Sequence, residues 1–264
     1  KTLFSNIDGN FNTAIGNNAL YSNTSGHYNT AMGEGALCSM EEGYCNIAMG
    51  NGAGCREESN YYCSFLGYDA DNRSSTTRTN SIALGAYSSI TADNQVRIGD
   101  ADITSIGGYV GWTNLSDERY KININQDIPG LAFITKLRPV SYNLNVTKLN
   151  KDLNIPDSVS SRPELQMGIQ EKMAIKYTGF LAQEVEQAAK SIGFDFSGVD
   201  APKNEDDMYG LRYAEFVVPL VKAVQEQQII IEEQNKKLSE QELKNKALEE
   251  RILNLERAIN KLTK

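Results

Sequence analysis

The first hundred residues repeat a short apolar motif that ends in glycine. The segments NTAIG, NTAMG, NIAMG and SFLG end at residues 16, 33, 50 and 67, each 17 residues after the one before. SIALG and VRIG, which end at Gly85 and Gly99, continue the series at spacings of 18 and 14. A short fixed period is typical of solenoids, in which each repeat buries its apolar side against the next. Seventeen residues fit one coil of two short strands, so we predict a left- or right-handed β-roll over residues 1–115.

Neighbouring residues in a strand point to opposite faces of the sheet. The repeat therefore puts small residues on one face and larger apolar residues on the other: Ala14, Ala31, Ala48 and Ala83 against Ile15, Met32, Met49 and Leu84. A coil this narrow cannot bury both faces by itself, so we expect one face to pack on other copies of the chain. The pattern over residues 9–99 resembles the β-roll heads of trimeric surface adhesins and the rolls of phage fibres. A Gly/Asn-rich linker is the alternative.

The C-terminal residues follow a heptad pattern that begins at Val217. Position a is taken by Val217, Val224, Ile231, Leu238, Asn245, Ile252 and Ile259, and position d by Leu220, Gln227, Gln234, Gln241, Leu248, Leu255 and Leu262. Ten of these fourteen positions are apolar, which predicts a coiled coil over residues 217–264. Isoleucine at a with leucine at d favours two strands, whereas the roll favours three. Because the glutamines and Asn245 weaken the two-strand rule, we expect a homotrimer. One amphipathic helix folded on its own domain is the alternative.

Residues 116–216, between roll and coil, mix helical and strand-like patterns, which predicts an α+β domain. The segment after Pro129 predicts a helix that ends before Pro139, followed by a strand that contains Val140 and Tyr142. TGFLAQEVEQAAKSIG predicts a short strand and then a helix that ends at Gly193. Residues 2–120 contain no lysine, and 15 of the 21 glycines precede Ser116, so a domain boundary is expected near residue 115.

Composition and charge exclude several classes of function. A net charge of −8 without a clustered basic patch argues against nucleic-acid binding. No apolar run approaches the ~18 residues of a membrane span. The four cysteines contain no CxxC pair, and nothing in the sequence predicts a metal or cofactor site. Cys38 and Cys55 occupy the same place in successive coils, so their Cα atoms should lie ~5 Å apart, inside disulfide range. We favour free thiols over a bridge.

Four sequence blocks carry a family resemblance: SDERYK, LRPVSYNL, GFLAQEVEQ and LRYAEFVVPLVKAVQEQ. Their order and spacing, over about residues 115–228, are similar to the endosialidase-type intramolecular chaperone, the self-cleaving C-terminal module of phage tailspikes and fibres. The resemblance implies that the module assists trimerisation and then releases itself. It implies Ser116 as nucleophile, Lys121 as base and Leu115–Ser116 as the cut bond. It also implies a phage tail fibre or a bacterial cell surface as the location, with a receptor or glycan bound by a region before Lys1.

The chemistry of such a cut restricts the environment of the lysine. A serine hydroxyl is a weak nucleophile and needs a base to take its proton. A lysine is a base only when neutral, and at an ordinary pKa of ~10.4 fewer than about one in a thousand is neutral at pH 7. We therefore expect folding to bury Lys121. Five residues separate it from Ser116, so a turn through Asp117 and Glu118, or a lysine from another chain, must bring the two side chains together. Taken alone, SDERYK is more typical of a helix cap, with Ser116 or Asp117 as the N-cap.

Other readings of the sequence stay open at this stage. Glu184 in AQEVEQ is better explained as structural than as catalytic, and we expect Trp112 to pack at the junction of roll and chaperone. The main alternative to self-cleavage is an uncut trimeric adhesin head and stalk without protease activity. A hydrolase acting on other molecules is less favoured, because the sequence shows no Ser/His/Asp set and no carboxylate pair in a cleft.

Overall fold

The computed structural model describes residues 1–73 and 76–262, which fall into two compact units. The first unit comprises Lys1–Asn114, Val140–Gly179 and Ala201–Tyr209. The second comprises Leu115–Pro139, Phe180–Asp200 and the chain from Gly210 onward. Parts of the predicted chaperone region thus pack in the same unit as the roll. The boundaries predicted at residues 115 and 216 stay predictions, and residues 263–264 of the predicted coiled coil lie outside the described part.

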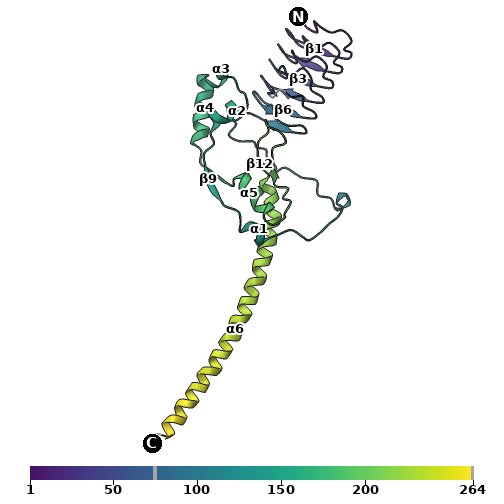
Figure 1. Cartoon of the computed structure of the whole chain (residues 1–264). Coiled ribbons are helices and arrows are strands. Elements are labelled where there is room, and N and C mark those ends of the chain that lie inside the picture. Colours follow the sequence, from purple (N-terminus) through teal and green to yellow (C-terminus); the bar gives the residue numbers. More distant parts are fainter. Residues whose placement is uncertain (74–75, 263–264) are drawn as a thin grey trace. The chain divides into compact units, whose positions relative to one another are not determined.

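The N-terminal region is a β-solenoid, which confirms the predicted roll (Figure 1). Its coils stack in parallel, so that one strand from each forms a six-stranded sheet in the order β1-β2-β3-β4-β6-β8. The register advances by one repeat per coil, with Ala14 opposite Ala31 and Ala31 opposite Ala48. The strands of this sheet are β1 (Thr13–Ile15), β2 (Thr30–Met32), β3 (Ile47–Met49), β4 (Ser64–Leu66), β6 (Ile82–Leu84) and β8 (Val96–Ile98).

The two faces of this sheet have the predicted residues. Ala31, Ala48 and Ala83 are fully buried inside the coil, together with Phe65. The opposite, outward face carries partly exposed apolar side chains: Ile15, Met32, Ile47, Met49, Leu66, Ile82, Leu84, Val96 and Ile98. Glycine ends the strand because a side chain does not fit there. A Cβ on Gly50, whose φ is +137°, would collide with the carbonyl of Gly67 in the next coil.

The prediction of two strands per coil was wrong for the early coils. A second pair of strands, β5 (Asp71–Asn72) and β7 (Ser89–Ile90), occurs only in the last coils. Elsewhere the other side of each coil is a run of turns, joined to the next coil by backbone hydrogen bonds such as Leu20 N–H to the Ala36 carbonyl at 3.0 Å. Buried asparagines add a ladder in which Asn46 N–H donates to Asn29 Oδ1 at 3.0 Å and Cys63 N–H donates to Asn46 Oδ1 at 2.9 Å. Side-chain amides thus satisfy backbone groups that a strand would otherwise pair.

The cysteine register is confirmed, and the preference for free thiols was wrong. Cys38 and Cys55 have Cα atoms 4.8 Å apart and form a disulfide. The parallel stacking of identical coils produces this distance, which lies within the range that a disulfide needs. Cys45 and Cys63 are free.

Asp71 is a fully buried carboxyl in the roll. One of its oxygens accepts the N–H of Asn72 at 2.8 Å, and the other lies 3.4 Å from Nε of Arg56. Burial raises the pKa of Asp71 to about 8, although the Asn72 hydrogen bond and two nearby arginines act in the opposite direction. At neutral pH the folded roll therefore holds this carboxyl in its protonated form.

We expect Asp71→Asn to stabilise the roll, relative to the parent chain, by an amount that grows as the pH rises from ~4 to ~8. An unfolded aspartate ionises near pH ~3.9, whereas the folded Asp71 stays protonated up to its pKa of about 8. Its contribution to stability is therefore complete at low pH and is lost as the pH rises through that value. Thermal unfolding of both chains, each carrying Ser116→Ala, should show a difference that widens to a few kcal/mol, as an order of magnitude. The exposed control Asp8→Asn should show little change. A pH-independent difference for Asp71→Asn would contradict this account.

The remainder of the first unit consists of short helices and one hairpin-like pair. β9 (Val140–Tyr142) pairs antiparallel with β10 (Tyr177–Gly179), and this confirms both predicted strands. Between them lie α2 (Val146–Asp152), α3 (Asp157–Ser160) and α4 (Pro163–Ala174), for which the sequence analysis made no prediction. Their apolar residues Val146 and Ile169 form a small core with Ala101, at the end of the roll.

The second unit has its own aromatic core. Phe133 is fully buried against Val185, Phe196 and Phe216. The predicted helices are present as α1 (Leu131–Ile134) and α5 (Ala182–Lys190). The same unit also contains η1 (Glu118–Tyr120), β11 (Val199–Asp200), β12 (Gly210–Leu211) and η2 (Tyr213–Phe216).

The predicted C-terminal helix is one continuous element, α6 (Val217–Leu262) (Figure 1). Its first turns are attached to α1, where the N–H of Leu131 donates to Glu226 at 2.7 Å. Gly130 is required at this contact because a Cβ would collide with the backbone at Ala223. None of the described helices combines the length and the apolarity of a membrane span.

Candidate functional site

Ser116 and Lys121 meet at a single turn of 3-10 helix. The turn η1 separates them, and Lys121 Nζ donates a hydrogen bond to Ser116 Oγ at 2.8 Å. Asp117 is the N-cap, since its carboxylate accepts the N–H of Arg119 at 2.9 Å. The capping pattern of SDERYK and the turn needed to join the two side chains are therefore the same structure. The sequence alone left open whether the lysine came from this chain, and here one chain supplies both groups.

The neighbouring carboxylate is engaged by an arginine. Both oxygens of Asp117 accept hydrogen bonds from the guanidinium of Arg119, the shortest at 2.6 Å. The Arg119 side chain, and then its backbone N–H, lower the pKa of Asp117 below its usual value. Asp117 is thus an acceptor for Arg119 at neutral pH and shapes the turn beside Ser116.

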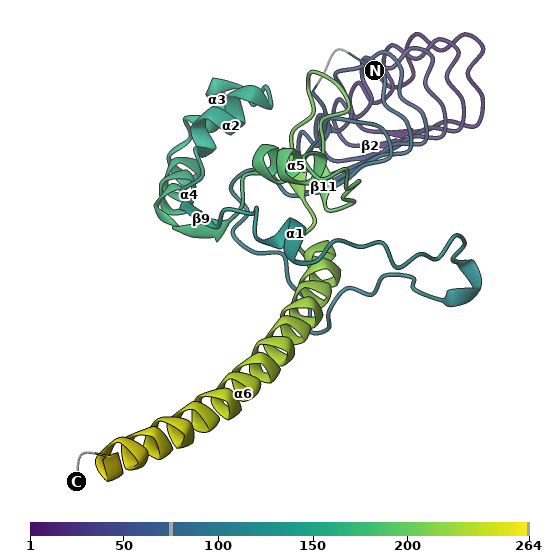
Figure 2. The same ribbon diagram turned by 60° about the horizontal axis from the view of Figure 1, so that its bottom comes forward.

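The expectation that Lys121 is buried is not met in the single chain. Ser116 and Lys121 are both exposed. Trp112, expected to pack at the junction of roll and chaperone, is 88% exposed. Figure 2 shows the surrounding segment as a long loop with the η1 turn at its tip. The hydrogen bond between Ser116 and Lys121 is therefore set by the local turn, and both side chains stay exposed in this structure.

This loop, residues 103–127, carries many apolar side chains for an exposed segment. They are Ile103, Ile106, Tyr109, Val110, Trp112, Leu115, Tyr120, Ile122 and Ile124. Leu115, on the acyl side of the predicted cut, is 82% exposed. Exposed apolar clusters of this kind mark surfaces that another molecule covers.

Glu184 has a structural partner that the sequence analysis missed. Arg138, from the LRPVSYNL block, donates from Nε to Glu184 at 3.0 Å and from its terminal nitrogen to the other oxygen. The hydrogen bond from Arg138 lowers the pKa of Glu184. This two-point ion pair joins the start of one block to the helix of the next, which supports the structural role expected for Glu184. The two residues lie 46 positions apart, so no local pattern in the sequence pointed to the pair.

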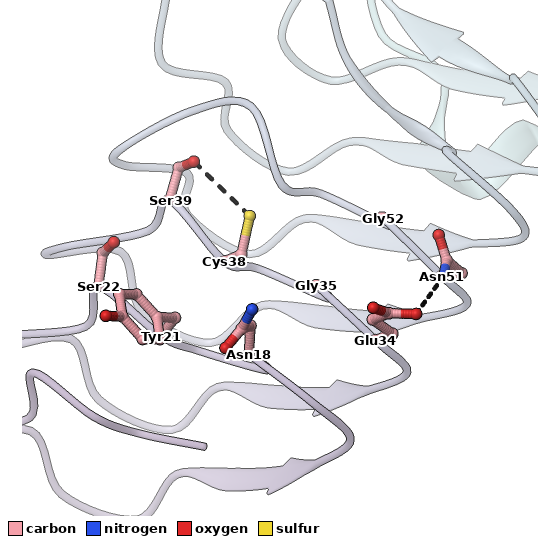
Figure 3. Close-up of a pocket in the computed structure, with 9 residues that line it drawn as sticks. All are labelled: Asn18, Tyr21, Ser22, Glu34, Gly35, Cys38, Ser39, Asn51 and Gly52. Atoms are coloured by element: carbon pink, nitrogen blue, oxygen red, sulfur yellow. Dashed lines mark hydrogen bonds between the residues drawn. The ribbon is translucent and has the colours of Figure 1, made fainter. Parts of the chain in front are cut away.

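A groove on the roll offers no catalytic set. It is lined by Asn18, Tyr21, Ser22, Glu34, Gly35, Cys38, Ser39, Asn51 and Gly52 (Figure 3). Glu34 is the one charged residue among these nine, and its carboxylate accepts a hydrogen bond from Asn51 at 3.2 Å. General acid–base hydrolysis needs at least two cooperating groups. The groove therefore does not support a hydrolase that acts on other molecules.

Comparison with known families identifies the region that contains the turn. Residues 116–194 match the Peptidase_S74 family, described as the chaperone of endosialidase. This confirms the resemblance drawn from the sequence blocks, although the block LRYAEFVVPLVKAVQEQ lies beyond the matched residues. The match begins at Ser116 itself. No match was found among curated proteins or among solved structures.

The fold and this match together define a β-solenoid followed by a C-terminal intramolecular chaperone. The family name indicates a peptidase. Residues 116–194 of this protein are accordingly similar to the chaperone of endosialidase.

Proposed function

We propose that residues 116–264 promote trimerisation of the β-roll and then release themselves by cutting the Leu115–Ser116 bond. The observation that carries the proposal is the 2.8 Å contact between Lys121 Nζ and Ser116 Oγ at the first residue of the family match. In the proposed step a neutral Lys121 takes the proton of Ser116 Oγ, which attacks the carbonyl carbon of Leu115. The C–N bond breaks as the proton passes to the amide nitrogen. Water then hydrolyses the resulting ester to the Leu115 carboxylate and the Ser116 hydroxyl.

Assembly supplies the burial that this chemistry needs. A neutral amine is favoured when it is removed from water, and in one chain the pair is exposed. Three apolar surfaces are open in the single chain: the outward face of the roll, the loop 103–127 and the seam of α6. On that seam Val224, Leu238, Ile252 and Ile259 are each more than half exposed. We propose that all three are covered by two further copies, so that cutting reports successful assembly.

The location follows from the same proposal. A roll that is folded by a removable C-terminal chaperone fits a phage tail fibre, a tailspike or a bacterial surface adhesin. The uncut adhesin remains the second candidate, and the exposure of Ser116 and Lys121 in a single chain is the observation that favours it.

We expect the Ser116→Ala chain to be a homotrimer in solution. Light scattering should give three times 29.2 kDa. The apolar seam of α6 and the outward face of the roll are removed from water only when other copies of the chain cover them. A monomer would contradict the role assigned to the roll face. A dimer would instead support the two-strand rule for isoleucine at a and leucine at d.

A further inference from the structure

A second set of contacts joins the roll to the chaperone region, independently of the chain connection at residue 115. Residues Ala201–Tyr209, here called the acidic loop, belong to the same compact unit as the roll. The loop contains the sequence NEDD at residues 204–207. It lies against the last two coils, of which the first contributes Arg78 and the second contributes Thr91 and Arg97.

Asp207 is the centre of this contact. Its side chain is only 6% exposed, and Oδ1 accepts hydrogen bonds from Thr91 at 2.8 Å and from Gln95 at 3.4 Å. Arg97 lies 3.7 Å from the same oxygen. Burial opposes ionisation of Asp207, but the hydrogen bonds from Thr91 and the backbone, together with Arg97, outweigh it and hold the pKa below its usual value. The carboxylate is therefore charged and engaged by the roll.

Two further residues of the acidic loop contact the last two coils. A carboxylate oxygen of Asp206 lies 3.3 Å from a terminal guanidinium nitrogen of Arg78, whose side chain is 7% exposed. Asn204 donates to the carbonyl of Thr91 at 3.0 Å. The last two coils thus present buried or half-buried cations and donors, and the acidic loop presents the acceptors that match them.

The helices α2 to α4 add an apolar contact and two backbone contacts. Tyr87 of the roll packs with Ile155, and Asn154 donates to the carbonyl of Arg73 at 3.2 Å. Lys172, which is 8% exposed, donates to the carbonyl of Ile103. Every roll residue in these contacts precedes the Leu115–Ser116 bond, and every partner follows it.

We propose that cutting alone does not release the chaperone, because the acidic loop and helices α2 to α4 hold the last two coils of the roll non-covalently. Hydrolysis of one peptide bond removes none of the contacts above. Release is then a separate step, limited by the breaking of the Asp206 and Asp207 pairs. This inference rests on the proposed function for its biological setting, but the contacts themselves do not depend on self-cleavage.

The test uses a full chain that is cut by an added enzyme. A recognition site for a sequence-specific protease is inserted between Gly107 and Gly108, which lie in the exposed loop, in a Ser116→Ala background. After digestion, the two pieces are followed by size exclusion in ~0.05 M and in ~1 M NaCl, where the Debye length falls to ~3 Å. We expect the pieces to co-elute at low salt and to separate faster at high salt.

The residues are tested with a matched pair of variants. Asp206→Asn/Asp207→Asn should speed dissociation of the nicked complex at least roughly tenfold, since buried bonds to a charged acceptor are lost. Asp195→Asn, an exposed carboxylate outside the acidic loop, should leave the rate unchanged. Separation of the parent pieces at once in low salt would overturn the proposal, as would equal rates for the double variant and the control. If the double variant fails to fold, a salt-independent rate for the parent would overturn it instead.

Failure of the proposed function is seen separately. The wild-type chain, without the inserted protease site, is followed on its own. If it stays full-length, self-cleavage does not occur, and this result is independent of how fast the enzymatically nicked pieces separate.

Discussion

A chain carrying Ser116→Ala will remain full-length on a denaturing gel, whereas the wild-type chain will give pieces of residues 1–115 and 116–264. Lys121→Ala and Lys121→Arg will also remain uncut. Arginine keeps a positive donor near Ser116 Oγ but does not deprotonate in proteins, so it cannot act as the base. We expect a loss of cutting rate of at least roughly a thousandfold for each variant.

These variants should lose cleavage but keep folding and assembly. Neither Ser116 nor Lys121 is buried in the single chain, so all three uncut chains should still assemble to the mass of the trimer. Ser105→Ala and Lys136→Ala change exposed residues of the same kinds and should cut at the normal rate. Cutting by Lys121→Arg would show that lysine is not the base. A single full-length band from the wild-type chain would favour the uncut adhesin.

Deleting residues 238–264 will abolish both assembly and cutting while leaving Ser116 and Lys121 in place. The deletion removes eight of the fourteen seam positions, among them six of the ten apolar ones. Without partners the loop 103–127 stays exposed, and a solvated lysine stays protonated and cannot serve as the base. Light scattering should then report a monomer of uncut chain.

A matched variant distinguishes the effect of losing apolar seam residues from the effect of shortening the helix. Replacing the seam residues Leu248 and Ile252 by asparagine keeps the helix intact but removes two apolar layers, and we expect it to slow cutting. Replacing Glu250, at the outer position f, by glutamine should not. If the deleted chain cuts at the normal rate as a monomer, then cleavage is not coupled to assembly.

The persistence of the roll after release would be kinetic. Once residues 116–264 leave, the roll has lost the part that assisted its folding, and its lifetime depends on the barrier to unfolding. The disulfide between Cys38 and Cys55 joins two successive coils and adds to that barrier. Because the acidic loop would still hold the roll after the cut, a nicked complex would form first. The free roll would appear only when that complex dissociates.

Elements dictated by local pattern were predictable from the sequence. The 17-residue period is a property of neighbours along the chain, so the coil register and the buried alanines followed from it directly. The heptads predicted the bounds of α6 because one helix of this length needs no tertiary information. The proline and glycine positions likewise placed α1, β9 and α5.

Elements that depend on contacts between distant residues were not predictable. Helix α4 has a weak amphipathic pattern, and residues of α2 and α4 pack in a small core with Ala101 at the end of the roll. The pair Arg138–Glu184 joins residues 46 apart, and the contacts of Asp207 span more than a hundred. No period or cap in the sequence signals such pairs.

The sequence by itself determined the roll, the long helix and the chaperone resemblance, because repeat spacing and short motifs are local along the chain. The same resemblance predicted Ser116 and Lys121 as the site. Only the tertiary structure decided that one turn brings these two side chains to 2.8 Å and yet leaves them exposed. It alone placed the acidic loop on the last two coils and gave the carboxyl of Asp71 its buried environment. The physical reason is that burial and charge pairing depend on which surfaces meet in space, and a linear pattern does not record that.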